Sequence, residues 1–435
     1  MHDHQPKILP DGFRKLDPPT RRERLRTALG IEAAADEFTA TGRDDSLVEL
    51  SSLMVESSIG YAPVPLGVAH GFLIDGVSYD LPMATEEPSV IAAASYAARI
   101  IAKGGGFTSH ATDPVMVTQL FLEGVDEAGL ERLSDESLRI GAEIQPFLGS
   151  LPARGGGFRG MSVERLPETG IAKVSISIDV RDAMGANILN TAGEGVCPLV
   201  EEISGGKRLM CILSNAATDR RGAARCAIPF SVLGGASGTN GDGAGTARRI
   251  ELATRVADED PSRGITHNKG VMNGISALAL ATFNDCRSIE AAAHGWAARS
   301  GRYRSLTSWR VEGEALVGEI ELPLSFGAVG GAAAFHPASR LALDMLGHPG
   351  APALARIAAA LGLAQNFAAL LSLVTGGIQK GHMRYHSPRI AYMAGARGAE
   401  IAAVAQAMTA EKNFSMHEAK ALLARYREGQ LPPRN

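Results

Sequence analysis

The chain is too long to fold around a single hydrophobic core. It has 435 residues, and cores stop growing at roughly 250–300 residues, beyond which chains divide into domains. The sequence therefore predicts two or three folding units. Aromatic residues make up only 5% of the chain, so alanine, glycine, leucine and valine must fill these cores.

Composition excludes several classes of protein. Hydrophobic residues are 45% and charged residues 21% of the chain, which is typical of globular proteins and excludes a disordered or fibrous one. The net charge of −4 gives no broad basic surface, so nucleic acid is not expected as the main partner.

Targeting signals and membrane spans are not evident in the sequence. Residues 1–10 are polar and carry no signal-peptide core, and apolar runs such as 275–283 are too short to cross a bilayer. The four cysteines, Cys197, Cys211, Cys226 and Cys286, form no CxxC pair. We therefore expect reduced, buried thiols in a cytoplasmic protein with no membrane partner.

Two local patterns predict structure near the amino-terminal end. Residues 67–83 alternate apolar stretches around Asp75-Gly76, which is a hairpin signature. Pro88 then opens an alanine-rich segment, 89–103, that glycines 104–106 close, as expected of a helix.

Residues 112–216 read as a separate α/β unit. The predicted elements are a helix at 130–144, a strand at 172–180, a helix at 188–203 and a strand at 208–213. Elements of this size can form a small sheet with helices on one face.

Two familiar motifs fail on inspection. The glycine-rich stretches 155–157 and 241–245 do not follow an apolar strand with GxGxxG spacing, which argues against a Rossmann site. His382 and His386 would share one helix face, but no glutamate follows His382 as in the HExxH pattern. We therefore expect no metal.

Two charged clusters remain. Glu86 and Glu87 precede a predicted helix, and taken alone they favour capping of its positive end. Residues 266–270 read Thr-His-Asn-Lys-Gly, with Arg263 before them and Asn273 after them. Such a cluster at a helix entry suits an anionic ligand.

Together these segments resemble the HMG-CoA (3-hydroxy-3-methylglutaryl-CoA) reductases of the soluble bacterial kind, class II. Residues 182–187 match DAMGAN letter for letter, and further segments resemble ENVIG (56–60), EEPSVVAAAS (83–95) and THNKGIMNG (266–274), followed by Asn284-Asp285, 330–331, 362–366 and 381–383. Ser57 and Ser58 stand where the family has Asn and Val, which leaves the dimer contact of that segment open.

The resemblance implies an α+β fold with three parts. Residues 1–111 and 217–378 would form a large domain that binds HMG-CoA, and 112–216 an inserted small non-Rossmann α/β domain that binds the cofactor. Residues 379–435 would form a C-terminal helical flap. In the family the active site lies between two subunits, so the resemblance implies a homodimer at least.

The implied reaction interconverts HMG-CoA plus two NAD(P)H with mevalonate plus CoA, through a hemithioacetal and mevaldehyde. Hydride addition creates an oxyanion, which needs a cation, and the resemblance implies Lys269. A carboxylic acid donates protons near neutrality only when burial near other carboxylates raises its pKa. Glu87 matches this acid, with Glu86 as a structural cap and Asp285 between Lys269 and Glu87. His382 would protonate the departing thiolate.

The resemblance also implies binding residues. For the substrate these are Arg263, Ser89 and Asn273 at the HMG carboxylate and hydroxyl, Gln365 beside them, and Arg14 and Glu56 at CoA. For the cofactor they are Asp182, Ala183, Met184, Gly185, Ala186, Asn187, Asn215 and Gln145.

Gln145 stands where some relatives that prefer NAD carry an aspartate. The nearest arginines that could clamp a 2′-phosphate are Arg154 and Arg159. Because no phosphate clamp is evident, we expect NAD(H) to be favoured over NADP(H).

Two other functions fit parts of this pattern. Another CoA-thioester enzyme, such as a lyase or thiolase, would share the CoA-binding needs, but a thiolase requires a nucleophilic cysteine and no cysteine here lies in such a motif. A non-catalytic CoA-binding protein is the second alternative, and the presence of all four catalytic residues argues against it.

Overall fold

The structure is a computed structural model. It describes residues 16, 17, 20, 23, 45–331, 335–376 and 378–430, and for 45–49 and 378–385 it describes the backbone alone. Arg14 lies outside the described residues.

The larger of two sheets has six strands in the order β2-β1-β3-β8-β10-β9. The predicted hairpin is present, because β1 and β2 pair antiparallel from Ile74 opposite Val77. Asp75 and Gly76 form its turn with φ values of 51° and 80°, the left-handed conformations that a two-residue hairpin requires. The strands are β1 (Leu66–Ile74), β2 (Val77–Ala84), β3 (Phe107–Ala111), β8 (Arg221–Pro229), β9 (Thr307–Glu312) and β10 (Ala315–Pro323).

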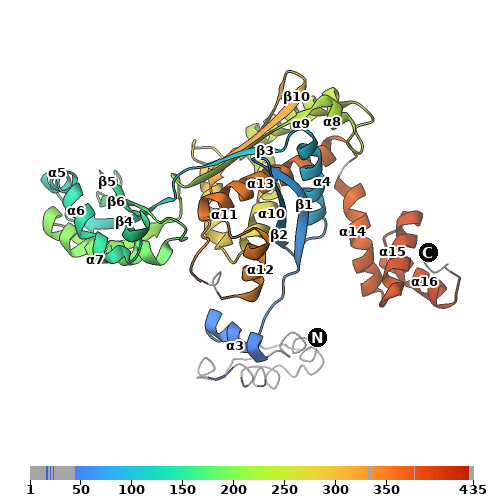
Figure 1. Cartoon of the computed structure of the whole chain (residues 1–435), viewed down its shortest axis with the longest axis horizontal. Coiled ribbons are helices and arrows are strands. Elements are labelled where there is room, and N and C mark those ends of the chain that lie inside the picture. The colour runs from blue at the N-terminus through green and yellow to red at the C-terminus, as the bar shows by residue number, and fades with distance from the viewer. Residues whose placement is uncertain are drawn as a thin grey trace.

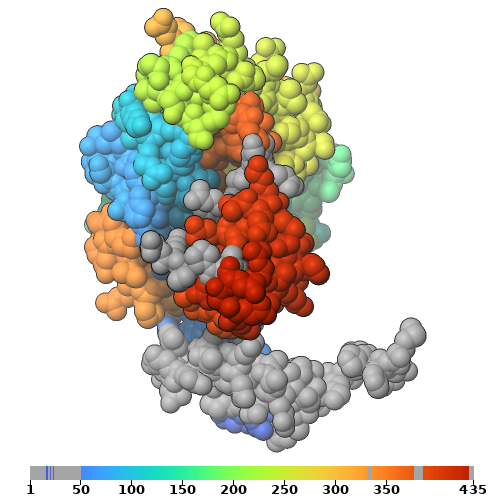
Figure 2. Space-filling model, turned by 90° about the vertical axis from the view of Figure 1, so that its right-hand side faces the viewer, coloured from blue at the N-terminus to red at the C-terminus, as the bar shows by residue number. Residues whose placement is uncertain are grey.

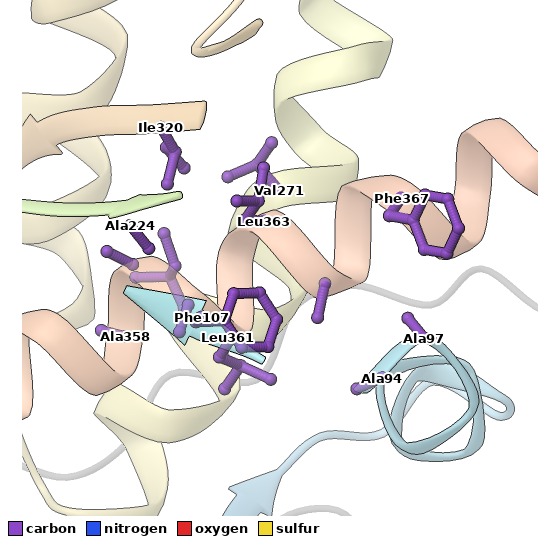
Figure 3. Packing of buried hydrophobic residues seen from close by; sticks show 14 of the residues in the cluster. Ala94, Ala97, Phe107, Ala224, Val271, Ile320, Ala358, Leu361, Leu363 and Phe367 are labelled. Atoms are coloured by element: carbon purple, nitrogen blue, oxygen red, sulfur yellow. The ribbon is translucent and has the colours of Figure 1, made fainter. Parts of the chain in front are cut away.

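Helix α13 (Ala351–Val374) runs through the core beside this sheet and contacts β3, β8 and β10 (Figure 1). Figure 3 shows its side chains Leu361, Leu363 and Phe367 beside Phe107 of β3 and Ala94 of helix α4. The surrounding helices are α4 (Val90–Lys103), α8 (Phe230–Gly234), α9 (Gly243–Glu259), α10 (Pro261–Ala281), α11 (Cys286–Ala297) and α12 (Pro337–Met345), and α3 (Asp45–Met54) precedes the sheet.

The expectation that every apolar run is too short to cross a bilayer is wrong for helix α13. By length and composition it could cross a membrane, yet 78% of its most apolar 18-residue window is buried inside the protein. Its hydrophobicity is therefore accounted for by its place in the core, where a helix is apolar on all sides.

The second sheet has four strands in the order β5-β6-β4-β7, and every pair is antiparallel. This pairing differs from the parallel sheet of a Rossmann domain. The strands are β4 (Val115–Glu123), β5 (Gly157–Arg165), β6 (Ala172–Asp179) and β7 (Lys207–Ser214). The helices of this unit are α5 (Glu127–Asp135), α6 (Ser137–Glu143) and α7 (Ala186–Ser204), with short 3₁₀ turns η2 (Gln145–Leu148) and η3 (Pro152–Arg154).

The prediction of one helical stretch at 130–144 is wrong in one respect, because two helices share this range. The chain breaks at Glu136, where the end of α5 meets the start of α6. The amide of Glu136 still bonds to the carbonyl of Arg132, so the helical hydrogen bonding carries on through a change of direction that periodicity does not reveal.

Separate hydrophobic cores form in three parts of the described chain. One joins residues 69–107 with 224–371, a second lies within 116–217, and a third lies within 391–423. The third belongs to α14 (Ile378–Met393), α15 (Ala399–Glu411) and α16 (Met416–Arg427). Figure 1 shows these three helices projecting from one side of the molecule, and in Figure 2, which views that side, they face the viewer in red.

Candidate active site

A cavity of about 950 Å³ opens between α4, α10 and α13. Six residues singled out from sequence line it, although they come from three distant segments: Glu87, Ser89, Arg263, Lys269, Asn273 and Gln365. Folding therefore brings together an ammonium, a guanidinium and a carboxylate that the sequence keeps far apart.

Helix α10 supplies both cations of this cavity. Asp260 caps the helix by accepting hydrogen bonds from the amides of Ser262 (3.0 Å) and Arg263 (3.3 Å). Lys269 and Asn273 are four residues apart and so lie on one face of the helix, and Arg263 lines the same cavity from the first turn. Desolvation lowers the pKa of the Arg263 guanidinium.

The expected helix entry at 266–270 is therefore wrong, since α10 already begins at Pro261. Lys269 lies in the third turn, where backbone amides are already bonded within the helix. Anion recognition here must come from side chains rather than from a helix terminus.

Helix α4 begins later than expected, at Val90, with Ser89 as its N-cap residue. Its first turn contains no acidic residue, so the interpretation of Glu86 as a cap is wrong, because the helix dipole acts only within the first turn. Glu87 lines the cavity and is exposed in the single chain. Ser89 has a left-handed backbone, φ 74°, a strained conformation that is common at functional sites.

A buried polar network supports the floor of the cavity around His267, which is 2% exposed. Its Nε2 lies 2.7 Å from Oγ1 of Thr307, 2.9 Å from Oγ of Ser305 and 3.1 Å from Nδ2 of Asn366. Burial, with a smaller contribution from Arg263, lowers the pKa of His267 to about 3. The imidazole is therefore neutral at physiological pH.

Sequence reasoning gave His267 no role of its own. Its partners lie 38 to 99 positions away along the chain, and no local pattern links them. The only sequence feature that pointed to this network was Asn366, which directly follows the predicted substrate residue Gln365.

The segment 182–187 lies in the turn that leads from β6, an interior strand of the second sheet, into α7. The Asp182 carboxylate accepts a hydrogen bond from the amide of Ala351 (2.8 Å), and its carbonyl accepts one from Ala328 (2.8 Å). Gly185 is the N-cap residue with φ 103°, and a Cβ there would lie 2.9 Å from Val180. Only glycine fits this position without strain.

Arg220 fastens this turn and was missed by sequence reasoning. Its Nη1 donates hydrogen bonds to the carbonyls of Ala183 and Met184, each at 3.1 Å, and its Nη2 donates to that of Phe326. The side chain is 3% exposed. Desolvation lowers the pKa of Arg220 to about 10, against the opposing effect of Asp179 and Asp182. A basic residue in a loop gives no sequence signal for such burial.

Asp285 lies on the side of this turn rather than in the cavity. Its carboxylate caps α11 by accepting hydrogen bonds from the amides of Arg287 and Ser288, both at 3.1 Å. The Ser288 hydroxyl in turn donates to Oδ1 of Asn215 (3.0 Å). Asp285 and Asn215 therefore share one neighbour.

Within one chain, Asp285 does not lie between Lys269 and Glu87. Lys269 precedes the end of α10 by twelve residues, so at 1.5 Å per residue the end of the helix, from which the chain continues to Asp285, lies about 18 Å from Lys269 along the axis. One chain thus holds two separate groups of candidate residues. After the roles that the sequence analysis expects of them, we call the residues of the cavity the substrate half-site, and residues 182–187 with Asn215 and Asp285 the cofactor half-site.

The remaining predicted residues lie elsewhere. Glu56 is exposed in the turn after α3 and is not among the residues that line the cavity. Gln145 begins η2, and its Nε2 donates a hydrogen bond to the carbonyl of Gly141 (3.3 Å). His382 lies on α14, but its side chain is outside the described part of the chain.

All four cysteines are free. Burial raises the pKa of Cys197 to about 11 and that of Cys226 to about 12, and it also raises those of Cys211 and Cys286. A nucleophilic cysteine needs the opposite shift, because the thiolate is the reactive form. The thiolase alternative is therefore not favoured.

Comparison with known proteins identifies the family. A family model described as hydroxymethylglutaryl-coenzyme A reductase matches residues 20–387. The 3-hydroxy-3-methylglutaryl-coenzyme A reductase of Archaeoglobus fulgidus is 42% identical over 426 residues, 96% of this chain and 94% of that protein. A probable reductase of the same name from Borreliella burgdorferi is 35% identical over 387 residues, 88% of this chain and 87% of that protein.

A solved structure agrees with these relatives. The class II reductase of Streptococcus pneumoniae, bound to NADPH in open conformations, superposes with a TM-score of 0.74 at 38% identity, and the match covers 94% of this chain and 99% of that one. The chain therefore belongs to the hydroxymethylglutaryl-coenzyme A reductase family, in its class II branch, and is an oxidoreductase that interconverts HMG-CoA and mevalonate.

Proposed function

We propose that the substrate half-site binds the HMG group and performs the chemistry of both reduction steps. The observation that carries this proposal is the gathering of Glu87, Arg263 and Lys269 around one cavity. Arg263, with Ser89 and Asn273 beside it, binds the HMG carboxylate and hydroxyl. The Lys269 ammonium faces the thioester carbonyl.

Each charged residue of this set compensates a charge that the substrate carries or develops during the reaction. The first hydride turns the thioester carbonyl into an oxyanion, which Lys269 stabilises as a nearby cation. Collapse of the hemithioacetal releases CoA thiolate and an aldehyde. The second hydride makes a new oxyanion at the same place, and Glu87 supplies the proton that completes the alcohol.

The cofactor half-site fits a reduced dinucleotide. The first amides of α7 have no side-chain cap at Gly185, and free amides at a helix amino terminus suit a pyrophosphate. Arg220 holds the preceding turn in place. Each reduced nicotinamide that binds there would supply one hydride, so two cofactors would be used in turn.

We further propose that two copies of the chain complete each active site. The half-sites of one chain are too far apart to act together, whereas a twofold arrangement can set the cofactor half-site of one copy against the substrate half-site of the other. Exposed apolar side chains around α3 and β1 support an interface between copies: Leu53 (73% exposed), Val55 (55%), Val64 (46%) and Leu66 (40%).

The remaining assignments follow from the same scheme. We assign 1–111 and 217–378 to the substrate domain, 112–216 to the cofactor domain and 379–435 to the flap, supported by their separate cores. Arg14 and Glu56 are assigned to CoA. Free cysteines support a cytoplasmic location.

The test of the proposed function is a direct assay of the purified protein. With HMG-CoA present, the near-ultraviolet absorbance of reduced nicotinamide should fall, with two cofactors oxidised and one CoA thiol released per substrate. A folded protein that binds HMG-CoA without oxidising either cofactor would contradict the proposal and favour a non-catalytic CoA-binding protein.

For the cofactor, we expect a higher kcat/KM with NADH than with NADPH. Of the two candidate phosphate ligands, Arg159 is already bound to the buried Asp179 carboxylate at 2.7 Å. An arginine held in an ion pair is less able to clamp a 2′-phosphate. A roughly tenfold preference for NADPH, about 1.4 kcal/mol, would overturn this expectation and direct mutagenesis to Arg154 and Arg159.

For the flap, His382→Gln should impair HMG-CoA reduction more than reduction of added mevaldehyde. Only the first reaction releases a thiolate that needs a proton, and an imidazole is suited to supply it near neutrality. Steady-state rates for the two substrates measure the difference, with His386→Gln on the same helix as the matched control. Equal losses in both reactions would contradict the assigned role.

A further inference from the structure

The segment that leads to Asp285 contains a strained residue. Phe283 has a left-handed backbone, φ 53°, which is a costly conformation for a bulky side chain. It occupies the position after α10 that glycine usually fills. Its amide donates to the carbonyl of Leu280 (3.1 Å), and the next amide, that of Asn284, donates to the carbonyl of Ala279 (2.8 Å). Such a conformation persists only where contacts from the rest of the fold hold it.

One such contact is an aromatic stack between Phe283 and His336, the N-cap residue of α12. The two ring centroids lie 3.8 Å apart, with 26° between the ring planes. Tyr61 packs edge-on against His336, with ring centroids 6.4 Å apart. Rings from three distant segments thus meet in one group, and we call Tyr61, Phe283 and His336 the aromatic cluster.

His336 has two separable roles at the start of α12. Its Nδ1 accepts a hydrogen bond from the amide of Ala338 (3.2 Å), and its ring face packs on Phe283. Burial lowers the pKa of the imidazole, so the ring is neutral at physiological pH and its proton lies on Nε2. Asparagine at this position would keep the cap without the stack, and phenylalanine would keep the stack without the cap.

Two hydrogen bonds hold the chain on either side of Phe283. The hydroxyl of the buried Ser339 on α12 donates to the carbonyl of Thr282 (3.1 Å). On the other side, Oδ1 of Asn284 accepts from the amide of Gly327 (2.7 Å). A Cβ on Gly327 would lie 2.7 Å from the backbone nitrogen of Met184. The end of α10 is therefore held against both α12 and the cofactor half-site.

The direction of the Asp285 carboxylate depends on this support. Its own hydrogen bonds come from the amides of Arg287 and Ser288, which fix the carboxylate relative to α11 alone. The backbone at Phe283 and Asn284 sets its place relative to the rest of the molecule. A misplacement of about 1 Å in a reacting group can lower a rate by about a hundredfold. The strained residue is therefore placed where a small change has a large effect.

We propose that the aromatic cluster positions Asp285 for catalysis. His336, supported by Tyr61, holds Phe283 in its left-handed conformation, and this conformation directs the Asp285 carboxylate to the substrate half-site of a second copy. Phe283 and His336 are thus positioning residues that act through Asp285. This inference rests on the proposed function, in which Asp285 completes a shared active site.

The first experiment separates the two roles of His336 in the full-length enzyme. His336→Asn keeps the cap but removes the stack, so kcat for HMG-CoA reduction should fall about tenfold or more, while the KM values for HMG-CoA and cofactor change less than about twofold. His336→Phe keeps the stack and loses the cap, so thermal stability should fall while kcat stays near that of the wild type.

A variant of Phe283 provides a second test that leaves α12 unchanged. Phe283→Gly removes the ring, but glycine adopts a φ of 53° without strain. The melting temperature should therefore stay near that of the wild type, because relief of strain offsets the lost stack. The kcat should still fall as in His336→Asn, since no ring then holds the conformation. A normal kcat in Phe283→Gly would overturn the inference.

A double-mutant cycle tests whether the effect passes through Asp285. In the Asp285→Asn background, His336→Asn should change the residual rate of hydride transfer by less than about twofold. Fully additive losses, or equal losses of kcat in His336→Asn and His336→Phe, would overturn the inference and leave the proposed function standing. Near-normal activity of Asp285→Asn would contradict both, because Asp285 would then have no role in the shared site.

Discussion

Lys269→Ala should lower kcat for HMG-CoA reduction by at least about a hundredfold, the usual loss when a stabiliser of a developing oxyanion is removed. No other cation of the described cavity lining can replace it, since Arg263, two helical turns earlier, is assigned to the HMG carboxylate. Fold and CoA affinity should be retained, because the side chain lines an open cavity rather than the core.

Stopped-flow absorbance of the reduced nicotinamide measures the first hydride transfer directly, and CoA binding is measured by calorimetry. Lys103→Ala is the matched control, because Lys103 lies exposed at the end of α4, outside the residues that line the cavity. Near-normal hydride transfer in Lys269→Ala would show that Lys269 does not stabilise the oxyanion.

Mixed dimers of Lys269→Ala and Asp285→Asn should regain activity, although each variant alone is nearly inactive. If each active site combines Lys269 of one copy with Asp285 of the other, the mixed dimer has one doubly altered site and one intact site. Random pairing makes half of the dimers mixed, so the co-expressed mixture should reach about a quarter of wild-type activity.

A pair of variants from the same half-site provides the control. Glu87 and Lys269 line the same cavity, so every site in a mixture of Glu87→Gln and Lys269→Ala carries one lesion, and no activity should return. If the Lys269 and Asp285 mixture also stays inactive while mixed dimers are present, the shared site is wrong and Asp285 acts only as the cap of α11.

The identities of adjacent residues were enough to predict several elements. The hairpin at 67–83 follows from alternation around Asp75-Gly76, and α4 ends where glycines begin at 104, because turns and helix ends depend on a few adjacent residues. The family motifs also named six residues of the cavity. They did so through resemblance, since no spacing rule links Glu87 with Lys269.

The strands β3, β4, β5 and β8 escaped prediction because most of their partners are remote. Strand β8, for example, pairs with β3 more than a hundred residues earlier and with β10 almost a hundred residues later. A strand is stabilised by the neighbours that bond to it and by the face it buries, and neither is visible within a short window of sequence.

The sequence by itself determined which chemical groups the protein contains and where its local turns and helix ends fall. Only the tertiary structure decided that Asp285 lies with the turn at 182–187 rather than beside Lys269, that Arg220 is buried beneath that turn, and that His267 is buried in a polar network with Thr307, Ser305 and Asn366. Each of these depends on side chains brought together from distant segments. Burial and hydrogen-bond partners of that kind exist only once the whole chain has packed.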